Sequence, residues 1–214
     1  MALLLATGTA SAEVEPEPLS LLIPGDYHGD EAPFSIGAGW FALVPTTGSW
    51  QLVPAQAKVE RIHDAVLDAD GQATGVRITA QTDAIALLRL PDLHPGKVNT
   101  PNMRFKGIDK PLSSASPIAI SFNGSLYHVG VKDSQAYLRN GSRTTLLPDI
   151  VVGGPESDDS ASLLWAGDLD GDGQLDLLVS YSGYNSGGVC LYISSKAPGS
   201  ALVHRIACHG GVGC

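Results

Sequence analysis

The sequence predicts an all-β protein made of antiparallel sheets, arranged as a sandwich or as a partial, propeller-like fold. Short apolar runs of about four to eight residues recur along the chain between turn-forming residues, which is typical of strands. Two Asn-Gly dipeptides, Asn123-Gly124 and Asn140-Gly141, separate such runs and favour two-residue hairpin turns. No stretch keeps the apolar spacing of an amphipathic helix over about eleven residues, so only helices of a turn or two are expected.

Composition places the chain among globular proteins and limits its partners. It has 214 residues, of which 43% are apolar and 16% charged, enough for one sizeable core or two small ones. The net charge is −9, and no Lys/Arg cluster could supply phosphate contacts, which argues against nucleic acid and anionic membrane surfaces as partners. The chain contains no apolar run of about eighteen residues, so we expect no membrane span.

Residues 1–12 have the features of a signal peptide remnant. An apolar segment is followed by Ala10-Ser11-Ala12, which fits a cleavage site for export, although a basic segment before it is missing. We therefore expect a true start upstream or a trimmed one, and a secreted or periplasmic protein. The alternative is a disordered apolar N-terminus.

Residues 13–90 are predicted to form an N-terminal β region after an extended Glu/Pro leader at 13–18. The expected strands are Trp40–Val44, Ser49–Pro54, Lys58–Leu67, Gly75–Thr79 and Ala84–Leu90. Between them, Asp68-Ala-Asp-Gly71 is interpreted as a plain turn. His28, in the loop Asp26–Glu31, and His63, beside Asp64, are weak candidates for metal binding or catalysis, because neither lies in a recognisable motif.

Residues 91–116 lack any periodicity, are rich in Pro, Asn, Lys and Ser, and are interpreted as a linker-like loop.

Residues 117–214 are predicted to form a C-terminal β region. Its expected features are a hairpin at Asn123-Gly124, a second at Asn140-Gly141, a loop at 181–188, and a hairpin of 189–193 with 201–207 across Pro198-Gly199.

Three cysteines allow one disulfide and one free thiol. Cys190 and Cys208 are symmetric about Gly199, which would place them opposite one another on the last hairpin. A pairing of Cys190 with either Cys208 or Cys214 fits an exported protein best. A reduced set of core cysteines is the alternative.

The most informative stretch is Trp165–Val179, which contains the pattern DxDxDGxxD. Its carboxylates are Asp168, Asp170, Asp172 and Asp176, and they repel one another by roughly 3 kcal/mol per pair at about 5 Å. A cation would offset this repulsion, Gly173 would permit the sharp turn, and the backbone carbonyl of Gln174 could add a neutral ligand. Ligation by oxygen alone in a flexible loop favours Ca²⁺ over Mg²⁺. Asp158 or Asp159 could contribute an outer-shell oxygen.

The same loop resembles a known calcium-binding repeat. Val179 stands where an EF-hand carries its closing glutamate, and the flanking runs read as strands, so the loop is not an EF-hand. Residues 166–179 are similar to the calcium loop of FG-GAP, integrin-like or VCBS-type repeats, within a similarity limited to about residues 162–194. This resemblance implies Ca²⁺ binding by Asp168, Asp170, Asp172, Gln174 through its carbonyl, and Asp176. The chain is too short for a closed seven-bladed propeller of such repeats.

These observations predict a calcium-binding extracytoplasmic β domain that acts as a non-enzymatic binding or scaffold module for an unknown protein or carbohydrate ligand. One alternative is a secreted inhibitor or immunity-type protein that caps a partner enzyme. A second is a metal-dependent hydrolase that uses the Asp-rich site or His28 and His63. Four protein carboxylates would leave the metal little room for substrate, which favours a structural role for the ion.

Overall fold

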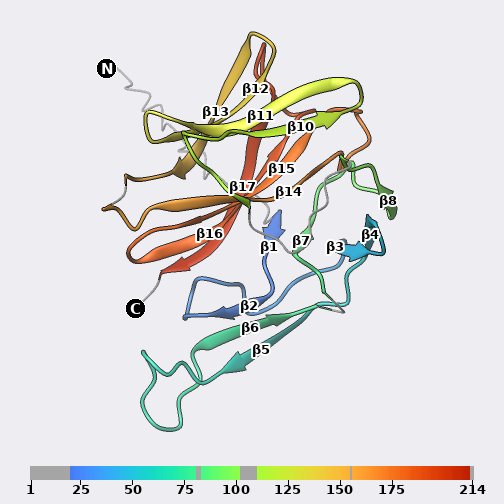
Figure 1. The fold of residues 1–214 in the computed structure, drawn as a ribbon. Coiled ribbons are helices and arrows are strands. Elements are labelled where there is room, and N and C mark those ends of the chain that lie inside the picture. Colours follow the sequence, from blue (N-terminus) through green and yellow to red (C-terminus); the bar gives the residue numbers. More distant parts are fainter. Residues whose placement is uncertain (1–19, 81–82, 102–109, 155, 213–214) are drawn as a thin grey trace, which may run out of the picture.

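In the described ranges 20–80, 83–101, 110–154 and 156–212, a computed structural model of the chain contains only strands as regular elements. They form four antiparallel sheets (Figure 1), so the predicted all-β class is confirmed. Within the same ranges, no helix is long and apolar enough to cross a membrane. Residues 1–12, which we interpret as a signal peptide remnant, and Cys214 lie outside the described ranges.

A five-stranded sheet of order β17-β16-β15-β14-β9 lies at the centre of the fold. Its strands are β9 (Lys110–Pro111), β14 (Ser160–Gly167), β15 (Asp176–Ser182), β16 (Ser186–Ile193) and β17 (His204–Val212). Successive side chains of β15 enter different cores, because Leu177 and Val179 belong to one apolar cluster and Leu178 to another. The central sheet is therefore buried on both faces, which explains the unbroken apolar run in β15.

A four-stranded meander covers one face of the central sheet. It consists of β10 (Ile118–Phe122), β11 (Ser125–Lys132), β12 (Gln135–Asn140) and β13 (Arg143–Val151), paired in sequence order. Alternate residues such as Ile118, Ile120 and Val129 point inward and share a core with Leu177 and Val179 of the central sheet. The period of two in these strands produces one buried face and one exposed face.

Two smaller sheets complete the stack on the opposite side. The first has the order β1-β7-β3-β4-β8, and the second β2-β6-β5. Their strands are β1 (Leu21–Leu22), β2 (Gly25–Tyr27), β3 (Phe41–Thr46), β4 (Ser49–Pro54), β5 (Lys58–Ile62), β6 (Gly75–Thr79), β7 (Ala86–Leu88) and β8 (Gly96–Val98). Leu43 packs with Trp165 of the central sheet, whereas its neighbour Ala42 packs with Val76 of the three-stranded sheet. Figure 1 shows the resulting succession of sheets from β10–β13 to β5 and β6.

The hairpin turns follow local backbone chemistry, with one correction. Asn123 and Gly124 have φ values of 44° and 78°, as expected for a type I′ turn. The turn predicted around Asn140-Gly141 is shifted by one residue, because Asn140 pairs with Arg143 as the last strand residue. Asp133 and Ser134, with φ values of 51° and 62°, form a further turn between Lys132 and Gln135. This turn contains no Gly, so the sequence gives no strong signal for it.

Several segments expected to be loops contain strands. Within 91–116, β8 pairs with β4 of the N-terminal region and β9 pairs with β14 of the central sheet. The predicted 181–188 loop is wrong in its extent, because β15 continues to Ser182 and β16 begins at Ser186. Conversely, the strand expected over Lys58–Leu67 ends at Ile62. Pairing with β4 and β14 produces strands in segments with few apolar residues, whereas residues 63–67 lie beyond the pairing of β5 with β6, which ends at Ile62 and Gly75.

A disulfide joins β16 to β17. Cys190 and Cys208 are register partners with a Cα–Cα distance of 4.0 Å, so the first of the two expected pairings is the one formed. The closed loop spans a sequence separation of 18, for which the restriction of the unfolded chain contributes about 3 kcal/mol. The bond fixes the outer edge of the central sheet.

Candidate metal centre

The Asp-rich loop connects the adjacent strands β14 and β15 of the central sheet. Gly167 pairs with Asp176, so the two ends of the loop are held together by the sheet. Gly171 and Gly173 have φ values of 81° and 80°, a left-handed conformation that strains any residue with a Cβ atom. The loop therefore folds back sharply and directs its acidic side chains toward one region.

Three of the loop carboxylates converge. Asp168, Asp170 and Asp176 each offer a ligand oxygen, and these atoms all lie within 4.8 Å of one another. Asp176 is fully buried and Asp168 is 8% exposed, so water screens their charges poorly. Within the described ranges, no other group of three or more His, Cys, Asp or Glu side chains meets this geometry. Close, buried carboxylates of this kind favour either a bound cation or protonation.

Hydrogen bonds fix Asp176 from both sides. One carboxylate oxygen accepts the N–H of Leu169 at 2.7 Å. The other accepts the N–H and the hydroxyl of Ser194 at 2.8 and 2.7 Å. Burial raises the pKa of Asp176 to about 7, although these hydrogen bonds act in the opposite direction. A cation beside this carboxyl would favour its ionised form.

Asp168 occupies the first position of the loop and organises its backbone. Its two oxygens accept the N–H groups of Gly171 and Gly173 at 2.7 and 3.0 Å. Burial raises its pKa, these N–H groups lower it, and the neighbouring carboxylates of Asp172 and Asp170 raise it further. The arrangement shapes the loop while leaving the Asp168 carboxylate within the converging group.

The other two predicted ligands lie differently. Asp172 is outside the converging group and accepts the backbone N–H of Gln174 at 2.7 Å and the Ser194 hydroxyl at 3.0 Å. Gln174 is exposed, and its side-chain amide donates to Asp172 at 3.3 Å. The donor set of the loop consists of oxygen atoms alone, which fits a hard cation such as Ca²⁺.

Residues distant in sequence support the loop and were not predicted. Ser194 and Ser195 follow β16, and the Ser195 hydroxyl donates to Asp170. Asn123 donates to the Gly173 carbonyl at 2.8 Å, and the carbonyl of Asn99 accepts the Asp168 N–H at 2.9 Å. The paired serines at the end of an apolar strand were the one available signal, but only the pairing of β15 with β16 places them at the loop.

A cavity of about 240 Å³ adjoins the loop and is lined in part by Asp168 and Asp170. Asp92 and His94 also line this cavity. Asp92 accepts a hydrogen bond from the Lys196 ammonium at 2.6 Å, which lowers the pKa of Asp92. Asp168 and Asp170 of the acidic group therefore border a cavity.

The remaining candidate residues lie outside the acidic group. His28 Nδ1 is 2.6 Å from the Asp64 carboxylate, and His63 Nδ1 is 3.1 Å from the Gln72 carbonyl. Asp159 accepts a hydrogen bond from the Ser157 hydroxyl at 3.1 Å, and Asp158 is exposed. The structure thus brings together Asp168, Asp170 and Asp176 but adds neither histidine to them.

Comparison of the chain with protein-family models, with curated proteins and with solved structures finds no match.

Proposed function

We propose that this protein is a calcium-binding β module of an extracytoplasmic compartment, in which Ca²⁺ stabilises the fold of a non-enzymatic binding or scaffold domain. The observation that carries the proposal is the convergence of the Asp168, Asp170 and Asp176 oxygens within 4.8 Å around a fully buried carboxyl. Such a group repels itself when ionised, and a divalent cation converts the repulsion into attraction.

The loop chemistry favours calcium among the hard cations. Ca²⁺ accepts about six to eight oxygen ligands in flexible geometry, which a loop of carboxylates and backbone carbonyls can provide. If the Asp172 side chain rotated toward the ion, its carboxylate and the backbone carbonyl of Gln174 would add oxygen ligands to those of the three converging carboxylates. The position of the loop between two antiparallel strands supports the proposed relation to FG-GAP or VCBS-type repeats, because an EF-hand loop would connect helices.

The disulfide supports the proposed compartment. Disulfides persist in oxidising environments and are rare in cytosolic proteins of most organisms. The Cys190–Cys208 bond, together with the cleavage-type sequence Ala10-Ser11-Ala12, fits a secreted or periplasmic protein. Capping of a partner enzyme and metal-dependent hydrolysis stay as alternative predictions that no observation on the site favours.

Calorimetric titration with Ca²⁺ tests the site directly. We expect one ion per chain, with a dissociation constant of about 10⁻⁴ to 10⁻³ M, the range of extracellular calcium modules. Asp170→Ala removes a ligand without disturbing the core and should weaken binding at least about tenfold, equivalent to about 1.4 kcal/mol.

The matched control is Asp70→Ala, which removes an exposed aspartate from the Asp68-Ala-Asp-Gly71 turn. This variant should bind Ca²⁺ as the unmodified protein does. Equal affinities for the unmodified protein and Asp170→Ala, or no heat of binding at millimolar Ca²⁺, would contradict the proposed site.

A further inference from the structure

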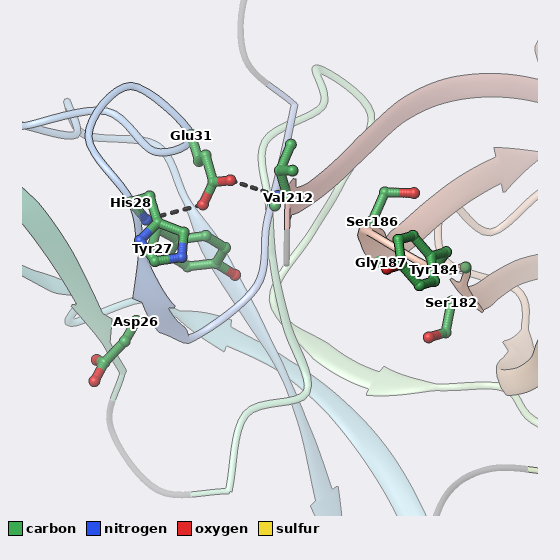
Figure 2. Close-up of a pocket in the computed structure, with 11 residues that line it drawn as sticks. Asp26, Tyr27, His28, Glu31, Ser182, Tyr184, Ser186, Gly187 and Val212 are labelled. Atoms are coloured by element: carbon green, nitrogen blue, oxygen red, sulfur yellow. Dashed lines mark hydrogen bonds between the residues drawn. The ribbon is translucent and has the colours of Figure 1, made fainter. Parts of the chain in front are cut away.

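A second cavity, of about 340 Å³, lies away from the Asp-rich loop and shares no lining residue with the first. It is formed between the loop after β2 and the end of the β15–β16 hairpin (Figure 2). Figure 2 shows His28 and Glu31 on one side, Ser182, Tyr184 and Ser186 on the other, and Val212 between them. Its volume lies within the range of about 300–1,000 Å³ that is usual for small-ligand sites.

The polar groups of the first wall are held in place. Glu31 accepts the N–H of His28 at 2.8 Å through one carboxylate oxygen and the N–H of Val212 through the other. The His28 ring is hydrogen-bonded to the Asp64 carboxylate. Asp64 is itself buried and accepts hydrogen bonds from the backbone N–H groups of Val66 and Leu67. Hydrogen-bonding groups fixed in this way lose little conformational freedom when a ligand binds.

Gly211 leaves room for the Glu31 carboxylate to lie close to the sheet. A Cβ atom at Gly211 would lie 2.6 Å from a Glu31 carboxylate oxygen, which is closer than real contacts allow. Gly211 pairs with Gly187, so bare backbone from both β16 and β17 lines this part of the cavity. A ligand can therefore approach the main chain itself.

The second wall carries an aromatic ring that folding does not bury. Tyr184 is 83% exposed, the largest value among the exposed large apolar side chains of the described residues. It lies at the tip of a tight hairpin in which the Gly183 N–H donates to the Ser186 carbonyl at 2.7 Å. Ser182 and Ser186, which carry hydroxyl groups, line the same cavity. The wall thus combines a flat apolar face with groups that both donate and accept hydrogen bonds.

The charges around the cavity exclude several ligand classes. No Lys or Arg side chain is part of its described lining, which carries the carboxylates of Asp26 and Glu31, and the His28 ring is already hydrogen-bonded to Asp64, so the site disfavours anionic ligands. Asp26 is neutralised by a two-bond ion pair with Arg77, at 2.6 and 2.7 Å, and each Glu31 oxygen already accepts an N–H group. Glu31 keeps its negative charge, but among its described residues the second wall of the cavity contains no carboxylate, so a polycationic ligand would find a single ion-pair partner. Peptide addition to the sheet at Val212 would compete with its bond to Glu31.

We infer that this cavity binds a neutral sugar residue of a glycan. The ring of Tyr184 would pack on the apolar C–H face of the sugar, while Glu31, Ser182 and Ser186 hydrogen-bond its hydroxyl groups. The inference assigns a ligand class to the binding role and does not depend on Ca²⁺, because the two cavities have separate linings.

An array of immobilised neutral, sialylated and sulfated oligosaccharides, with Lys- and Arg-rich peptides on the same surface, tests the inference. The intact protein should bind neutral glycans and no other class. Tyr184→Ala should weaken that binding about tenfold, whereas Tyr184→Phe, which keeps the ring, should bind within about twofold of the unmodified protein.

Leu126→Ala is the control, since it shortens an exposed side chain on β11, outside the cavity lining. Because Tyr184 is exposed, all three variants should retain the melting temperature of the unmodified protein. Failure to bind any neutral glycan, binding of sialylated or sulfated glycans or of the peptides instead, or undiminished glycan binding by Tyr184→Ala would overturn the inference.

Discussion

Replacement of Asp176 by alanine is expected to lower the free energy of unfolding by about 3–5 kcal/mol, even with a chelator present. Asp176 is fully buried and accepts hydrogen bonds from the Leu169 N–H and from the N–H and hydroxyl of Ser194. Alanine would leave both buried N–H groups without a partner, at about 1–3 kcal/mol each, and would open a small cavity. Urea unfolding in chelator measures this loss apart from calcium binding.

Two variants separate the structural and metal-binding roles of the loop. Asp176→Asn keeps the volume and one acceptor oxygen, so its loss in chelator should be smaller than that of Asp176→Ala. Asp170→Ala alters a less buried group that accepts hydrogen bonds from the Ser195 hydroxyl and, at 3.3 Å, from the Asp172 N–H, and should change stability in chelator by no more than about 1 kcal/mol. All three should gain less stability from added Ca²⁺ than the unmodified protein does. An Asp176→Ala protein as stable as the unmodified one would refute this account of the loop.

The second large effect is acid destabilisation through His209 on β17. Its Nδ1 accepts the N–H of Ile23 at 3.1 Å, so the folded state requires a neutral ring. Burial lowers the pKa of His209 to about 4, against the opposing influence of the Glu31 carboxylate. Between about pH 6.5 and pH 4 the unfolded chain binds more protons at His209 than the folded chain does. The contribution of His209 to the free energy of unfolding therefore falls as the pH falls. The expected loss is about 3 kcal/mol.

A comparison of variants isolates this residue from the other titrating groups. In chelator, the difference in unfolding free energy between the unmodified protein and His209→Gln should decline by about 3 kcal/mol from pH 7 to pH 4. Contributions from carboxyl groups are common to both proteins and cancel in the difference. His204→Gln, at an exposed position on the same strand, should show no such decline. A pH-independent difference for His209→Gln would contradict the buried, neutral imidazole.

Local patterns were sufficient for much of the fold. The boundaries of β4 and β6 coincide with the predicted Ser49–Pro54 and Gly75–Thr79. The Asn123-Gly124 turn and the opposition of Cys190 and Cys208 also follow from short-range geometry. The acidic loop could be located from its spacing alone, since DxDxDGxxD contains both the carboxylates and the glycine that its backbone requires.

Long-range pairing determined what sequence patterns missed. β8 and β9 contain few apolar residues and are strands only because β4 and β14 offer them edges. Ser194 reaches Asp176 across 18 residues, through the pairing of β15 and β16. Likewise, a hydrogen bond beside the second cavity joins the Val212 N–H to Glu31, which are 181 residues apart. No local period or motif connects residues separated by such distances.

The central claim, that Ca²⁺ stabilises this fold through the Asp168–Asp176 loop, is tested most directly by thermal unfolding with excess Ca²⁺ and with chelator. At about a hundredfold excess over the dissociation constant, binding should contribute roughly 2.7 kcal/mol. For a chain of this size that corresponds to a rise in melting temperature of about 5–10 °C. At the same Ca²⁺ concentration the rise in Asp170→Ala, whose affinity is expected to be at least about tenfold lower, should be no more than about half as large. Identical melting curves in Ca²⁺ and in chelator for the unmodified protein would contradict the claim.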